Sequence, residues 1–167
     1  MSTATTNFQL APMSPLIRTL TLLLLAVPVV FLTQPAVAGG WLALPAFLLI
    51  GIYAWVWLWF RPTLFVVHPG EVEVIWPLRR RQLPRDKISE VKLIDKTDLR
   101  RKTGWAMRVG AGGLWGGFGW LWTEKRGIVQ MYISRTDGFV WIERSDERPW
   151  LITPEHATTF VRVMSGK

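Results

Sequence analysis

The chain has 167 residues, 50% of them hydrophobic, with 11 Trp, 8 Phe and no Cys. This length corresponds to one domain of roughly 150 residues, and the composition excludes a disordered chain and one held together by disulfides. All 12 acidic residues and 19 of the 20 basic residues follow position 60, so Arg18 is the only charged side chain before it. The sequence therefore predicts a membrane anchor followed by a basic domain.

The clearest membrane segment covers residues 41–60, which include no charged side chain. A helix of this length spans about 30 Å, the thickness of the hydrocarbon layer of a bilayer. Trp55, Trp57 and Trp59 lie near its end, and Arg61 follows it. Because aromatic residues beside a cation are typical of the point where a helix leaves the bilayer, these three Trp are candidates for the membrane interface.

An earlier apolar segment, residues 16–32, predicts a first transmembrane helix. A polar tail (1–15) precedes it, and a short connector (33–40) joins it to the second helix. Arg18 would extend its guanidinium group toward the lipid headgroups. The alternative is a cleaved signal peptide, because residues 36–39 read Ala-Val-Ala-Gly, which is typical of a cleavage site. The sequence leaves both readings open.

The distribution of Lys and Arg predicts the orientation. The connector contains neither residue, whereas Arg18 and Arg61 lie at the outer ends of the two segments. By the positive-inside rule, both ends of the hairpin are then cytoplasmic. If the first segment were cleaved, the second would still run inward, so both readings predict that residues 62–167 are cytoplasmic.

After residue 62, apolar and polar residues alternate, which is typical of half-buried strands. Turn-forming residues separate the alternating segments, and their spacing predicts an antiparallel meander of about seven strands. Residues 96–103 are expected to form a charged, exposed loop. The expected strands are residues 64–67, 71–76, 78–83, 88–93, 128–134, 139–143 and 149–153.

The C-terminal residues predict one amphipathic helix. Thr153 is expected as its N-cap and Pro154 at its first position. A helix of this kind is expected to cover an open end or face of the preceding sheet. Its apolar stripe consists of Ala157, Phe160, Val161 and Met164.

Six stretches of the domain form a recognisable pattern: residues 64–72, 76–84, 88–91, 110–120, 129–134 and 151–155. Together they resemble the bacterial PH-domain membrane protein family over about residues 62–166. The resemblance implies an N-terminal transmembrane helical hairpin followed by a mainly-β pleckstrin-homology-like (PH-like) barrel, with about seven antiparallel strands and one C-terminal capping helix. It also implies the bacterial cytoplasmic (inner) membrane as the location, and it transfers no catalytic residue.

Residues 109–123 contain six glycines and no charge, which excludes an ordinary helix. One reading is a twisted strand pair whose aromatic side chains fill the barrel. The other is an aromatic loop in the membrane interface. Both readings concern the same four side chains, which are Trp115, Phe118, Trp120 and Trp122.

Two basic triplets are candidates for binding phosphate-bearing lipids or a partner. They are Arg79, Arg80 and Arg81, and Arg100, Arg101 and Lys102. Alternatively, the first triplet keeps a solvated sheet edge from pairing with other chains. Nucleic acid is not expected as a partner, because no motif that reads it accompanies the sequence pI of about 10.6.

An enzyme is not expected, because the sequence offers no nucleophile motif, and His68 and His156 lack partners at metal-ligand spacing. We therefore expect no metal and no cofactor. The first functional hypothesis is a membrane-anchored binding module that recognises a protein partner or an anionic lipid headgroup. The second is a structural subunit of a larger membrane or transport assembly. Expected partners are the lipid bilayer and either another membrane protein or further copies of the chain.

Overall fold

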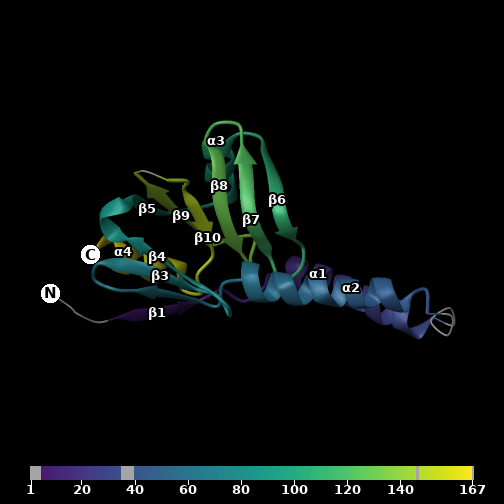
Figure 1. Cartoon of the computed structure of the whole chain (residues 1–167). Coiled ribbons are helices and arrows are strands. Elements are labelled where there is room, and N and C mark those ends of the chain that lie inside the picture. Colours follow the sequence, from purple (N-terminus) through teal and green to yellow (C-terminus); the bar gives the residue numbers. More distant parts are fainter. Residues whose placement is uncertain (1–4, 35–39, 146, 167) are drawn as a thin grey trace.

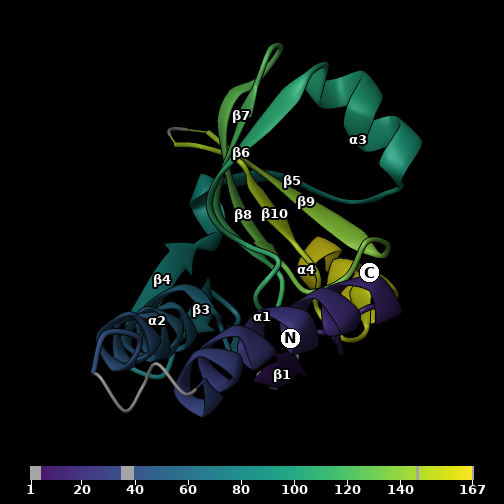
Figure 2. The ribbon, with the colours of Figure 1, turned by 90° about the vertical axis from the view of Figure 1, so that its right-hand side faces the viewer.

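A computed structural model describes residues 5–34, 40–145 and 147–166. It consists of a helical hairpin that projects from one side of a mainly-β domain (Figure 1). The cleavage-like pattern at residues 36–39 lies outside the described residues. Viewed along the hairpin, the two helices lie below the strand pair formed by β6 (Ala106–Gly112) and β7 (Gly117–Thr123) (Figure 2).

The hairpin consists of α1 (Pro15–Thr33) and α2 (Ala43–Trp55), and α2 continues into the π-helical turn η2 (Val56–Phe60). By length and composition, both helices could cross a membrane. They lie close to the predicted segments 16–32 and 41–60. The hydroxyl group of Tyr53 donates a hydrogen bond to the backbone oxygen of Leu24 at 2.9 Å, which joins the two helices.

The N-terminal segment is not a separate polar tail. Residues Thr6–Gln9 form strand β1, which pairs antiparallel with β2 (Leu64–Val67). Phe8 is buried, and its ring centroid lies 5.1 Å from that of Phe160. The expectation of a tail was wrong because four residues show too little alternation to indicate an edge strand.

The strands form two sheets. The first has the order β1-β2-β3-β4, and the second has the order β5-β9-β10-β8-β7-β6. The remaining strands are β3 (Glu71–Ile75), β4 (Arg80–Pro84), β5 (Ile88–Ile94), β6 (Ala106–Gly112), β7 (Gly117–Thr123), β8 (Gly127–Ile133), β9 (Phe139–Arg144) and β10 (Trp150–Ile152).

The expected closed barrel of about seven antiparallel strands is corrected in three ways. The sheets do not close, because β4 ends at Pro84 and the 3-10 turn η3 (Arg85–Lys87) leads into the edge of the other sheet. The described residues form ten strands, since β1, β6 and β7 add to the seven expected. Finally, β10 lies between β8 and β9 and runs parallel to β8, so the second sheet is mixed and is not a meander.

The main core lies between the two sheets, and helix α4 (Ala157–Ser165) packs against it through Phe160 and Met164. The predicted apolar stripe is therefore correct. The predicted N-cap is wrong, because α4 begins after His156. Thr153 instead accepts a hydrogen bond from the backbone N–H of Ala11 and another, on its side chain, from that of Ser134, both at 2.9 Å.

Residues Lys96–Thr103 form helix α3 instead of the expected loop. The side chain of Asp95 caps its N-terminus by accepting a hydrogen bond from the backbone N–H of Asp98, at 2.6 Å. Gly104 ends the helix with a φ of 70°. Leu99 packs on a second core, which lies on the face of the larger sheet that is turned away from the smaller one.

Candidate functional site

The second basic triplet lies in the last turn of α3, where cations interact favourably with the helix dipole. Arg101 forms an ion pair with Asp98 at 2.5 Å. Lys102 lies 3.3 Å from a carboxylate oxygen of Glu143, and its Nζ lies 4.5 Å from the ring centroid of Trp141. Both cations therefore have partners within the domain, but only Lys102 links α3 to β9, because Asp98 lies on α3 itself.

Glu143 also accepts a hydrogen bond from the indole N–H of Trp141 at 2.8 Å. Burial by itself raises the pKa of Glu143. The opposite effect is larger, because the carboxylate accepts hydrogen bonds from Trp141 and Lys102 and is attracted by the charges of Lys102 and Arg126. The net pKa of Glu143 therefore lies below its ordinary value. The carboxylate thus stays ionised and holds Lys102 in place.

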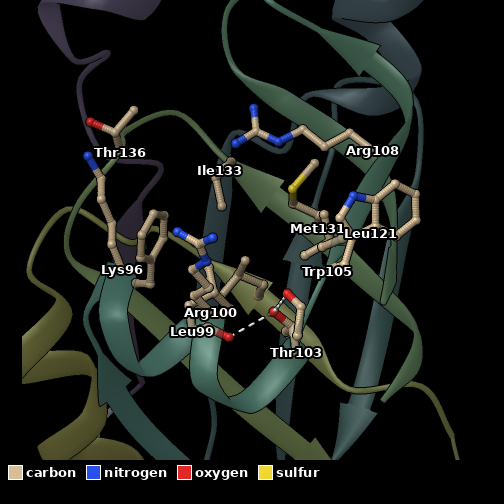
Figure 3. A pocket seen from close by; sticks show the side chains of 14 residues that line it. Lys96, Leu99, Arg100, Thr103, Trp105, Arg108, Leu121, Met131, Ile133 and Thr136 are labelled. Atoms are coloured by element: carbon tan, nitrogen blue, oxygen red, sulfur yellow. Dashed lines mark hydrogen bonds between the residues drawn. The ribbon is translucent and has the colours of Figure 1, made fainter. Parts of the chain in front are cut away.

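Arg100 is the member of this triplet that points toward a cavity of about 540 Å³ between α3 and the larger sheet. We call this cavity the α3 pocket. Two further cations line it, Lys96 from the first turn of α3 and Arg108 from β6. Figure 3 shows the guanidinium groups of Arg100 and Arg108 reaching over the pocket from α3 and β6.

The floor of the α3 pocket is apolar. Its side chains come from β7, β8, β9 and β10, and they belong to the second core. Trp105, which is 70% exposed, stands at the rim. The buried apolar side chains of the lining are Leu121, Met131, Ile133, Phe139 and Leu151.

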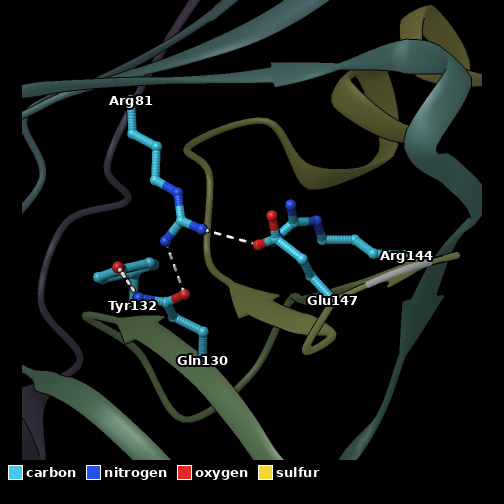
Figure 4. A network of polar contacts seen from close by, with 5 residues as sticks. All are labelled: Arg81, Gln130, Tyr132, Arg144 and Glu147. Atoms are coloured by element: carbon cyan, nitrogen blue, oxygen red, sulfur yellow. Dashed lines mark hydrogen bonds and ion pairs between the residues drawn. The ribbon is translucent and has the colours of Figure 1, made fainter.

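The first basic triplet lies at the start of β4 and is largely engaged within the domain. Arg81 donates hydrogen bonds to Gln130 at 3.1 Å and to Glu147 at 2.9 Å (Figure 4). Its guanidinium carbon also lies 5.3 Å from the ring centroid of Trp150. Arg144 is bound to the same carboxylate at 2.6 Å, so Arg81 belongs to a network that joins the two sheets.

The other two members of this triplet are more exposed. The guanidinium carbon of Arg79 lies 4.3 Å from the ring centroid of Trp76. Arg80 lies 3.7 Å from a carboxylate oxygen of Glu73 on the neighbouring strand. Both therefore remain available to a ligand at the surface, although each already contacts a side chain of the domain.

The structure does not combine the two triplets into one site. Arg81 contacts Gln130 of β8, whereas the α3 pocket is lined by Met131, the next residue of the same strand. Because successive residues of a strand point to opposite faces, the two triplets serve opposite faces of the larger sheet.

Residues 109–123, the segment rich in glycine and aromatic residues, lie mostly in the antiparallel strand pair β6–β7. A strand pair is one of the two structures that the sequence predicts for this segment. Phe118 is buried in the main core, whereas Trp120 and Trp122 are 41% and 56% exposed. Each pairs with an exposed apolar residue of β6, Val109 opposite Trp120 and Met107 opposite Trp122. Four large apolar side chains thus share one exposed face of this strand pair.

The turn between β6 and β7 packs against α1. The side-chain oxygen of Thr21 accepts a hydrogen bond from the backbone N–H of Trp115 at 2.9 Å, and it lies 3.0 Å from the carbonyl oxygen of Gly113. Gly116 has a φ of 155°, and a Cβ there would lie 2.1 Å from the carbonyl oxygen of Ile133. This turn therefore requires glycine, which explains part of the glycine content of the segment.

Trp115 also contacts the second helix, because its ring centroid lies 4.8 Å from that of Trp57 in an edge-to-face arrangement. Arg61 stacks on the same Trp57 ring, 4.2 Å from its centroid. Trp55 and Trp59 are exposed on the sides of the hairpin. The contacts of Trp57 and Trp115 thus bring together aromatic candidates from two distant parts of the sequence.

The sequence did not identify Lys96, Arg108 and Thr21 as functional candidates. Arg108 and Thr21 are isolated polar residues, and Lys96 belongs to a charged segment but to neither triplet, so the importance of all three depends on tertiary contacts. One signal was available for α3, since Asp95 and Asp98 form the spacing of an N-terminal capping motif and Gly104 supplies the end of the helix.

Among residues 5–34, 40–145 and 147–166, no three His, Asp or Glu side chains gather as a metal ion would require.

A family model described as a bacterial PH domain matches residues 64–167. The matched region includes both basic triplets and the α3 pocket, whereas β1 and the helical hairpin precede it. No curated protein and no solved structure gives a significant match.

Proposed function

The chain belongs to the bacterial PH domain family, and from this premise we propose that it is a non-enzymatic binding module anchored in the bacterial cytoplasmic membrane. Its hairpin crosses the bilayer, and its PH-like domain lies on the cytoplasmic face, where it recognises an anionic lipid headgroup. The apolar length of α1 and α2 supports the anchor. Few of their side chains are buried, whereas a helix within a soluble core would bury its apolar face.

The pairing of β1 with β2 supports a hairpin topology. Strand β1 precedes α1 and β2 follows η2, so both ends of the hairpin must lie in the same compartment for this pair to form. Arg18 and Arg61 lie at these two ends, and an excess of cations favours the cytoplasmic side. Cleavage after residue 38 would remove Phe8 from the main core, which argues for a retained first helix.

The observation that carries the proposal is the contact of the β6–β7 turn with both helices through Thr21 and Trp57. It fixes the strand pair beside the hairpin, and β6 is the strand of the larger sheet nearest the far end of the helices (Figure 1). A domain held in this way would present Val109, Trp120 and their neighbours to the membrane interface, where aromatic side chains are favoured.

Single-cysteine labelling tests the anchor and its orientation, because the chain contains no Cys. We expect Trp41→Cys, at the exposed tip of the hairpin, to react with a membrane-impermeant maleimide added to intact cells. Asp86→Cys, in the turn between β4 and β5, should react only after the membrane is permeabilised. Labelling of Asp86→Cys in intact cells, or release of the chain by alkaline carbonate, would contradict the proposal.

A structural subunit of a larger membrane or transport assembly is the second candidate. The exposed apolar face of β6–β7 favours it, because another protein could cover these side chains. A nitroxide attached at Val109→Cys in vesicles distinguishes the two functions, with Asp86→Cys as the control. Collisions with oxygen but not with a water-soluble relaxation agent would support contact with lipid. Protection from both reagents would support a protein contact.

A further inference from the structure

The cations around the α3 pocket have no acidic counterpart in its wall. Lys96, Arg100 and Arg108 line it, and none of the described lining residues is Asp or Glu. Like charges that surround one cavity repel each other, and a bound anion would relieve this repulsion. Two guanidinium groups also match the geometry of a phosphate group, which accepts paired hydrogen bonds from Arg.

The floor of the pocket indicates that the anion carries an apolar part. Free phosphate would contact only the cations and leave two apolar lining residues uncovered, Leu99, which is partly exposed, and Trp105, which is 70% exposed. The volume of about 540 Å³ lies within the range of small-molecule sites, roughly 300–1,000 Å³. A cationic rim above an apolar floor therefore fits an amphiphile whose headgroup is a phosphate and whose chain is a hydrocarbon.

The position of the pocket indicates where such a molecule would come from. One wall is β6, the strand of the larger sheet nearest the far end of the helices (Figure 1). Its end reaches α1, whereas Arg108 lies near its start and Trp105 just before it, at the other end of the strand. Resting on the membrane anchoring proposed above, we propose that the α3 pocket binds one anionic phospholipid drawn from the adjacent leaflet. The phosphate is held by Lys96, Arg100 and Arg108, and part of one acyl chain lies on the apolar floor.

The test uses the full chain, purified in a neutral detergent, and native mass spectrometry with soluble short-chain ligands. The ligands are dihexanoyl phosphatidic acid, dihexanoyl phosphatidylcholine and inorganic phosphate. We expect phosphatidic acid to bind at least tenfold more tightly than either of the others. Equal binding of inorganic phosphate would overturn the assignment to a lipid, and equal binding of phosphatidylcholine would overturn the role of the anionic charge.

The variant Arg100→Gln with Arg108→Gln removes two cations from the rim, and both side chains are exposed, so folding should be retained. We expect it to bind phosphatidic acid at least tenfold more weakly. The matched control, Arg148→Gln with Arg162→Gln, removes the same charge from exposed positions outside the pocket and should change binding less than twofold. Equal loss in both variants would mean that net charge, and not the pocket, determines binding.

A failed binding test can be told apart from a failed anchor. Binding to the pocket is measured in detergent and does not require a bilayer, whereas the cysteine labels report only on the membrane. Normal labelling with no effect of the rim variant would overturn the pocket and leave the anchored module standing.

Discussion

The side-chain oxygen of Thr21 lies 2.9 Å from the backbone nitrogen of Trp115, although 94 residues separate them in the sequence. Thr21 is buried in α1, a helix whose other surfaces are largely exposed. Its hydroxyl group joins a helix of the proposed anchor to a turn of the β-domain. Together with the contact between Trp57 and Trp115 and the pairing of β1 with β2, this bond orients the domain relative to the hairpin.

Thr21→Val should lower the free energy of unfolding by about 1–2 kcal/mol, because it leaves the N–H of Trp115 without this acceptor. The side chain keeps its shape, so packing should change little. Denaturation of the full chain in mild detergent measures the loss. Thr19→Val is the matched control, since Thr19 is exposed on the same helix. Equal stability of the two variants would show that the bond contributes nothing.

Phe8→Ala should cost about 3–5 kcal/mol, because it removes a buried ring from the main core. The same loss is expected for Phe160→Ala, and a double-mutant cycle should give a coupling of about 0.5–1.5 kcal/mol for the edge-to-face contact. Asn7→Ala, at the exposed neighbouring position, should change stability by less than about 0.5 kcal/mol. A loss below 1 kcal/mol for Phe8→Ala would mean that β1 does not dock.

These two sites illustrate what the sequence could and could not predict. Continuous apolar segments and regular alternation identify the two helices, most strands and the apolar stripe of α4, since each depends on local periodicity. Strand β1 and the bond of Thr21 depend on pairing across the hairpin, which leaves no periodic signal in the chain. The parallel position of β10 likewise follows from packing in three dimensions, because local alternation is the same in parallel and antiparallel strands.

The candidate site shows the same division. The basic triplets were visible as runs of charge, but the sequence could not distinguish Arg100, which points toward a pocket, from Lys102, which has partners in the domain. Arg108 is isolated in the sequence and joins the pocket only because β6 lies opposite α3. Runs of charge therefore located the region, and tertiary contacts separated binding candidates from structural cations.

Within the first triplet, the contacts predict unequal effects on stability. Arg81→Gln removes contacts with Gln130, Glu147 and Trp150 and should cost about 1–2 kcal/mol. Arg80→Gln removes the same charge from a side chain that is 71% exposed and should cost less than about 0.5 kcal/mol. Thermal and denaturant unfolding in detergent compare the two variants. An equal loss would contradict the assignment of Arg81 to the network between the sheets.

The stability of the domain should decrease in acid, partly because of Glu143. Burial raises the pKa of this carboxyl group, but Trp141, Lys102 and Arg126 lower it to a net value below the ordinary 4.5. The folded state therefore binds this proton less tightly than the unfolded state does. The resulting stabilisation is complete above the unfolded pKa and is lost as the pH falls through the folded pKa.

We therefore expect the melting temperature to fall between about pH 5 and pH 3 and the variant Glu143→Gln to show a shallower fall in this range. The variant should also be less stable at neutral pH, because Lys102 loses its nearest carboxylate partner. Glu155→Gln, at an exposed position near the start of α4, serves as the control and should keep the acid dependence of the unmodified chain. If Glu143→Gln kept that dependence as well, other carboxylates would have to account for it, and folding would not lower the pKa of Glu143.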